Sequence, residues 1–148
     1  MERCNWVTND ALYIKYHDEE WGKPVYDDAV LFEFLLLESF QAGLSWITIL
    51  KKRENFRHAF DGFNYKKIAT YGTEKVEQLL QNEGIIRHRG KIEAAVNNAK
   101  FFQEIQKEHG SFSDYIWSFV NGKSLDNKVK NIKDVPAKTE VSDAIAKD

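Results

Sequence analysis

The chain has 148 residues, a formal net charge of −2 and one cysteine. This length predicts a single domain over residues 1–148, and one cysteine excludes an internal disulfide framework and suits a reducing cytoplasm. No apolar run approaches the ~20 residues that span a bilayer, and no signal-peptide pattern opens the chain, so we expect a cytoplasmic protein without a membrane partner. Because an overall basic excess is absent, a polyanionic partner would need locally concentrated positive charge.

The first half of the chain predicts three helices separated by short breaks. Asn9 or Asp10 can cap the first helix, and Asp27 can cap a second, longer one. Gly43 can end that second helix in the left-handed conformation. Ser45 can then cap a third helix directly after the break.

The second half also has helical periodicity. Short helices are predicted around residues 66–70 and 74–81, a long amphipathic helix from Lys91, and one more over residues 112–119. No alternating strand pattern of useful length occurs. The sequence therefore predicts an all-α fold.

One acidic residue stands out on the long second helix. Spacings of three and four place five residues on one face: Leu31, Phe34, Leu35, Glu38 and Ala42. A buried, unpaired carboxylate is costly and normally takes up a proton or finds a cation. Either the helix phase is shifted so that Glu38 points to water, or Glu38 lines a cavity for a positively charged group. The nearby helix break and aromatic residue favour the cavity.

Five runs, in collinear order along the whole chain, resemble the DNA-3-methyladenine glycosylase I family of the helix-hairpin-helix superfamily. They are MERCNWV at 1–7, YHDEEWG at 16–22, QAGLSWITILKKREN at 41–55, GIIRHRGKI at 84–92 and WSFVNG at 117–122. The resemblance implies a helix-hairpin-helix glycosylase fold. It implies hydrolysis of the N-glycosidic bond of 3-methyladenine in double-stranded DNA after base flipping, with free 3-methyladenine as product. No redox or nucleotide cofactor is expected, and we expect a monomer.

The resemblance assigns the catalytic role to Glu38, which would contact the polar edge of the flipped base. Aromatic base-binding residues would be Trp6, Tyr13, Tyr16 and Trp46. Methylation at N3 leaves adenine positively charged while it is attached to the sugar, so a strong general acid is unnecessary. Aromatic faces suit a cationic or electron-poor ring. From the residues alone, the same aromatics could form an ordinary core.

Base flipping leaves a gap in the duplex, and the resemblance places a wedge at the break after the second helix. Leu44 would be the inserted side chain, with Gln41 beside it and Gly43 allowing the tight turn. The local sequence is equally consistent with Leu44 as a hydrophobic staple of the next helix.

Positive charge is concentrated where the long amphipathic helix begins. The resemblance implies that a hairpin grips the DNA backbone there, through Arg87, Arg89, Gly90 and Lys91. The helix dipole disfavours cations at this end, and a bound phosphate reverses that effect. Without the resemblance, the charged run would be read as a solvated loop.

Cys4 and His17 resemble one half of a structural zinc site, whose other histidine and cysteine lie in the family's C-terminal region. This sequence lacks that region, so either the chain is a shortened form or it holds no stable zinc. The final helical segment, which follows a polar linker over residues 121–138, likewise either docks on the body or has been cut short. A shortened chain would be marginally stable and could be a non-catalytic DNA-binding module.

Overall fold

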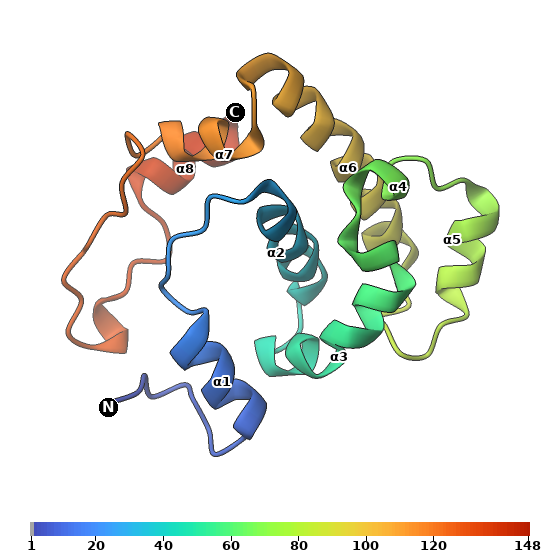
Figure 1. The fold of residues 1–148 in the computed structure, drawn as a ribbon. Helices are drawn as coiled ribbons and strands as arrows, with labels where there is room; N and C mark the ends of the chain where they lie inside the picture. The colour runs from blue at the N-terminus through green and yellow to red at the C-terminus, as the bar shows by residue number, and fades with distance from the viewer. Residues whose placement is uncertain (1) are drawn as a thin grey trace.

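The computed structural model describes residues 2–148 and confirms the all-α prediction (Figure 1). No strand occurs within this range. The elements in chain order are α1 (Ala11–Glu19), α2 (Asp28–Gln41), α3 (Trp46–Ala59), η1 (Asp61–Phe63), α4 (Tyr65–Ile68), α5 (Thr73–Leu80), α6 (Arg89–His109), α7 (Phe112–Ser118), η2 (Ile132–Asp134) and α8 (Glu140–Lys147). None of the helices in this part of the chain is long and apolar enough to cross a membrane.

The predicted helix caps are confirmed. The Asp10 carboxylate accepts from backbone N–H groups at the start of α1, Asp27 does so for α2, and Ser45 does so for α3. Gly43 has a φ of +80°, which a residue with a side chain rarely adopts. Together these residues fix the sharp turn between α2 and α3.

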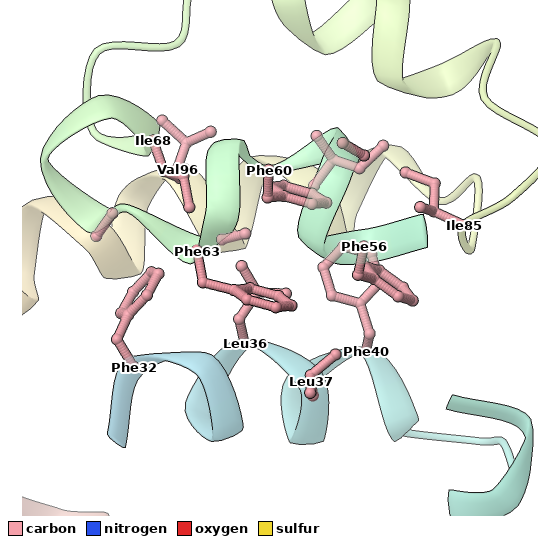
Figure 2. Close-up of a cluster of buried hydrophobic side chains, with 14 of the residues drawn as sticks. Phe32, Leu36, Leu37, Phe40, Phe56, Phe60, Phe63, Ile68, Ile85 and Val96 are labelled. Atoms are coloured by element: carbon pink, nitrogen blue, oxygen red, sulfur yellow. The ribbon is translucent and has the colours of Figure 1, made fainter. Parts of the chain in front are cut away.

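Helix α2 lies at the centre of the molecule and supplies one side of the core (Figure 1). Figure 2 shows its apolar side chains pointing toward α3, η1 and α4, with α6 behind them. The side chains of α2 that do this are Phe32, Leu36 and Phe40, and Leu37 is buried in the same cluster. Opposite them lie Phe56, Phe60, Phe63, Ile68 and Val96. Each of these nine side chains is buried, so this cluster anchors the helix that carries Glu38.

The predicted core face of α2 is wrong. Leu35, Glu38 and Ala42 are exposed, and the core face instead carries Phe32, Glu33, Leu36, Leu37 and Phe40. The cause is the sequence LFEFLLLESF, which is apolar around most of the helix, so spacing alone does not set its phase. The buried acid of this helix is Glu33.

Glu33 is 8% exposed and is neutralised by two arginines of α3. Its Oε1 accepts from Arg53 Nε at 2.9 Å and from Arg57 Nη2 at 2.8 Å. Arg53 also donates through Nη1 to Glu20 Oε2 at 2.9 Å. Glu20 follows α1, so this ion network joins α1, α2 and α3.

The last helix lies beside α7 at the end of the polar linker (Figure 1). Thr139 caps α8, and the Tyr115 hydroxyl of α7 donates to the Asp148 carboxylate. Ile145 lines a cavity shared with α2 and α7. The last helix therefore docks on the body of the protein.

Candidate active site

A cavity of about 250 Å³ lies where α1, α2 and α3 meet. Pockets for drug-sized ligands are typically about 300–1,000 Å³, so this one suits a smaller flat group such as a single base. Its walls are mainly aromatic and include one carboxylate: Trp6, Tyr13, Tyr16, Trp21, Glu38, Gln41 and Trp46. The structure thus brings together every residue that the sequence assigned to base binding.

Glu38 reaches this cavity because it lies on the face of α2 turned away from the core. Within residues 2–148 its carboxylate has neither a salt bridge nor a hydrogen bond. Although Glu38 is exposed to solvent along the open side of the cavity, the cavity walls partly desolvate its carboxylate, and this raises the pKa of Glu38 above its ordinary value of 4.5. Both sequence-based alternatives are therefore partly right: the helix phase is shifted, and the carboxylate lines a cavity. An unpaired, partly desolvated carboxylate is suited to receive a cation.

The aromatic residues form the walls of the cavity, and Trp46 also packs against the main core. The Trp6 ring lies 5.1 Å from that of Tyr13, and the Tyr16 ring lies 5.5 Å from that of Trp46. In the described part of the chain, Trp46 Nε1 is the one buried side-chain polar atom without a hydrogen-bond partner of normal geometry, although it lies close enough to the Tyr16 hydroxyl to lower the pKa of that hydroxyl. Such an unsatisfied donor costs about 1–3 kcal/mol, and functional sites are where it is tolerated.

Tyr16 keeps its proton across the neutral range. Burial raises the pKa of its hydroxyl, and the negative charges of Glu38 and Glu20 raise it further. Arg53 and the indole of Trp46 oppose this shift without reversing it. The cavity therefore offers a neutral hydroxyl beside its carboxylate.

Trp21 is a cavity residue that the sequence reasoning missed. Its ring lies edge-on to Trp6, 5.4 Å away, and is half exposed. Trp21, Tyr16 and Glu38 also line a second cavity of about 580 Å³, which extends toward α7 and α8. The signal was present in the run YHDEEWG, which contains both Tyr16 and Trp21.

The turn from α2 to α3, residues 41–46, is called the wedge loop here. Leu44 lies at this turn and is exposed, although it is large and apolar. Its N–H donates to the Gln41 carbonyl at 2.7 Å, and Gln41 Nε2 donates to the Leu44 carbonyl at 2.6 Å. Gln41 also lines the smaller cavity. An ordered loop thus presents an exposed apolar side chain beside the cavity.

The basic segment, residues 84–91, leads into α6. His88 caps this helix, its Nδ1 accepting from the Lys91 N–H at 3.1 Å. A Cβ at Gly90 would lie 3.0 Å from the His88 ring, so glycine leaves room for the cap. Arg87 is exposed, whereas Arg89 donates to Glu77 at 2.5 Å. Arg89 can bind a phosphate only by exchanging this partner.

Lys91 has partners other than a phosphate. Its Nζ donates to the backbone carbonyls of Phe40 and Ala42, at 2.9 and 2.7 Å. To bind a phosphate as predicted, Lys91 would have to give up these two hydrogen bonds at the end of α2.

A family model described as methyladenine glycosylase matches residues 6–148. The chain belongs to this family. A DNA-3-methyladenine glycosylase from Haemophilus influenzae is 53% identical to it over 145 residues, which cover 98% of this chain and 78% of the relative. The chain thus spans about four fifths of that protein.

Solved structures of family members have the same fold. A crystal structure of 3-methyladenine DNA glycosylase I superposes with a TM-score of 0.95 at 51% identity and covers 99% of this chain and 80% of its own. A tyrosine-to-phenylalanine variant of 3-methyladenine DNA glycosylase I, solved in complex with 3-methyladenine, gives the same TM-score at 39% identity. It covers 99% of this chain and 79% of its own.

Cys4 and His17, the two residues that the sequence predicted as metal ligands, lie side by side. Their Sγ and Nε2 atoms are 3.4 Å apart. Two ligands on one tetrahedral zinc ion, with bonds of about 2.3 and 2.0 Å, would be separated by about 3.5 Å. His17 Nδ1 contacts the Asp18 carboxylate at 2.9 Å, and Arg3 holds that carboxylate in turn. Across residues 2–148, no group of three or more metal-binding side chains is found.

Proposed function

We infer that this chain is a DNA repair glycosylase that hydrolyses the N-glycosidic bond of 3-methyladenine in alkylated double-stranded DNA. Its identity to a protein named for that activity supports the inference, as does the fold shared with an enzyme solved in complex with 3-methyladenine. The observation that carries it is the cavity, in which the unpaired carboxylate of Glu38 faces aromatic walls. We further propose that the enzyme acts as a monomer.

The geometry fits the chemistry of this base. Methylation at N3 makes adenine cationic while it is still bound to the sugar. The N9–C1′ bond then breaks with its electron pair passing to the base, which leaves neutral, and a water oxygen bonds to C1′ as the water loses a proton. Ionised Glu38 binds the cationic base in preference to neutral adenine. Its negative charge also stabilises the positive charge that develops on the sugar as the bond breaks. Stacking against the aromatic walls of the cavity would hold the base in place.

Release of the base tests this function directly. Incubating the chain with duplex DNA that contains 3-methyladenine should release the free base, detected by chromatography, and leave an abasic site. An undamaged duplex of the same sequence is the control and should release nothing. Tight DNA binding without release would instead support the second candidate, a non-catalytic helix-hairpin-helix DNA-binding module, which the exposed Leu44 and Arg87 alone would serve.

We also propose that Cys4 and His17 are two ligands of a structural zinc site. The 3.4 Å separation of Sγ and Nε2 supports this, since it matches one edge of a zinc tetrahedron. The contact between Asp18 and His17 Nδ1 turns Nε2 toward Cys4, as in many carboxylate–histidine–zinc sites, and a metal would displace the Cys4 N–H that donates to Nε2 at 3.4 Å. A zinc ion here would tie the N-terminal segment to α1.

Zinc bound by this pair should shield the Cys4 thiolate. Excess Zn²⁺ is therefore expected to slow alkylation of Cys4 by iodoacetamide, because a metal-bound sulfur is a weaker nucleophile. His17→Ala should abolish this protection, whereas His58→Ala, at an exposed histidine of α3, should retain it. Equal alkylation rates with and without zinc would contradict the assignment.

A further inference from the structure

The wedge loop leaves α2 with carbonyl groups that the helix itself does not satisfy, as at every helix end. The Gln41 carbonyl accepts from the Leu44 N–H, within the loop. The carbonyls on either side of it, those of Phe40 and Ala42, both accept from Lys91 Nζ, at 2.9 and 2.7 Å. One ammonium group from another helix thus satisfies two carbonyls at the end of α2.

Electrostatics favour this placement of the Lys91 charge. Lys91 belongs to the first turn of α6, where the helix dipole disfavours a cation. Its Nζ reaches the C-terminal end of α2, where the dipole has the opposite sign and lysine commonly hydrogen-bonds the last carbonyls. The two helix ends therefore act in the same direction, and both hold the ammonium at the wedge loop.

The wedge loop and the basic segment are also joined on the other side. Asn55 of α3 donates through Nδ2 to the Gly84 carbonyl at 3.0 Å. Lys91 ties the end of the basic segment to α2, which enters the wedge loop, and Asn55 ties its beginning to α3, which leaves it. The Lys91–Ala42 contact spans 49 positions in the sequence and the Asn55–Gly84 contact spans 29. Together they tie both ends of the basic segment to the helices on either side of the wedge loop.

We propose that Lys91 is a positioning residue for base flipping: it holds the wedge loop in register with the basic segment and binds no phosphate itself. This inference rests on the proposed function. Inserting Leu44 at the gap requires the loop to stand at a set distance from the gripped backbone. A loop released from Lys91 would have to be ordered on each insertion, at an entropic cost.

The test is Lys91→Met, which keeps the side-chain stem and removes the ammonium. Single-turnover excision of 3-methyladenine paired with thymine should slow by about ten- to hundredfold, since a displacement of about 1 Å can cost a hundredfold. Excision of the same lesion opposite an abasic site should slow by less, because that base is already unpaired and needs less help from the wedge. Affinity for free 3-methyladenine should stay within twofold.

Matched variants separate positioning from charge. Lys100→Met removes the same charge from an exposed position of α6 and should behave like the wild type. Lys91→Arg keeps donors for both carbonyls and should recover most of the rate. Arg87→Met should lower the slope of log affinity against log salt by about one if Arg87 binds a phosphate, whereas Lys91→Met should leave it unchanged.

A double-mutant cycle with Leu44→Ala decides whether Lys91 acts through the wedge. If it does, Lys91→Met should add little to the loss that Leu44→Ala already causes. A reduced salt slope, with equal slowing opposite thymine and opposite the abasic site, would make Lys91 a phosphate ligand and overturn the proposal. If Lys91→Met does not fold, a Lys91→Arg variant as slow as Leu44→Ala would overturn it as well. If the wild-type protein does not bind free 3-methyladenine, that result would instead count against the proposed function.

Discussion

Replacing Glu38 by glutamine should weaken binding of free 3-methyladenine by about tenfold to 150-fold. Loss of a charge-assisted hydrogen bond costs about 1.5–3 kcal/mol, and an amide of the same shape keeps the volume but not the charge. Excision from DNA should slow by a similar factor, since the carboxylate then no longer favours the cationic base. Isothermal titration calorimetry and single-turnover excision measure the two effects.

The choice of control follows from α2 itself. Ser39 is adjacent to Glu38, and its hydroxyl donates to the Leu35 carbonyl at 2.7 Å rather than facing the cavity. Ser39→Ala should therefore leave both affinity and rate near the wild-type values. Calorimetric affinity of Glu38→Gln within twofold of the wild type would remove Glu38 from base recognition.

The same carboxyl predicts an acidic limit to activity. Because burial raises the pKa of Glu38, the group takes up its proton at a higher pH than an exposed glutamate, whose pKa is near 4.5. The kcat/KM for methylated DNA should fall as the pH drops through this raised pKa, since the lesion keeps its positive charge and its partner becomes neutral. Glu38→Gln should lack this limb of the profile.

Stability should change in the opposite sense. A carboxyl whose pKa is raised by folding binds its proton more tightly in the folded state, so its stabilising contribution is present at low pH and is lost as the pH rises through the folded pKa. At pH 7 the ionised Glu38 is therefore a cost that glutamine lacks. The melting temperature of Glu38→Gln at pH 7 should equal or exceed that of the wild type, and the gain should vanish below about pH 4. A lower melting temperature at pH 7 would indicate a structural role.

Local signals were sufficient for the helix boundaries near the cavity. Asp27 and Ser45 each cap a helix through a contact three residues away, and Gly43 has the positive φ expected of it. Such contacts depend on a few neighbouring residues and can be read from residue type. The phase of α2 could not be predicted this way, because its burial depends on packing against α3, α4 and α6.

Long-range polar contacts were not predictable from spacing. Glu33 and Arg53 are 20 residues apart, and Lys91 is 51 residues from Phe40. Nothing in the local sequence of Glu33 distinguishes it from Glu38, the other glutamate on α2. The helical period directed attention to Glu38 although its face is not the core face, the resemblance to known glycosylases assigned its role, and the structure then separated the two glutamates by their partners. Glu38 faces the cavity, whereas Glu33 belongs to the core.

Arg53→Met should give the largest loss of stability. Arg53 bridges Glu33 and Glu20 with hydrogen bonds of 2.9 Å each, and its guanidinium lies 5.1 Å from the centre of the Phe34 ring. Arg57 still pairs with Glu33 in this variant, so the loss is that of charge-assisted hydrogen bonds, about 1.5–3 kcal/mol, rather than that of an unpaired buried charge. For a chain of this size that corresponds to a melting temperature lower by about 3–12 °C, measured by calorimetry. Arg57→Met should cost less, because Arg57 is more exposed and makes no bridge to Glu20.

A double variant separates the stability of this network from its effect on the cavity. Replacing both Glu33 and Arg53 by leucine removes the buried charges together, and such apolar replacements are often neutral or stabilising, so the melting temperature should recover. The bridge to Glu20 is still lost in this variant, and with it a polar link between α1, which carries Tyr16, and the rest of the cavity. Affinity for free 3-methyladenine should therefore stay below that of the wild type although stability returns. If melting temperature and affinity recover together, packing alone positions α1. If the melting temperature stays low, the empty space left around the two leucines, and not the lost contact between Glu33 and Arg53, causes most of the loss of stability.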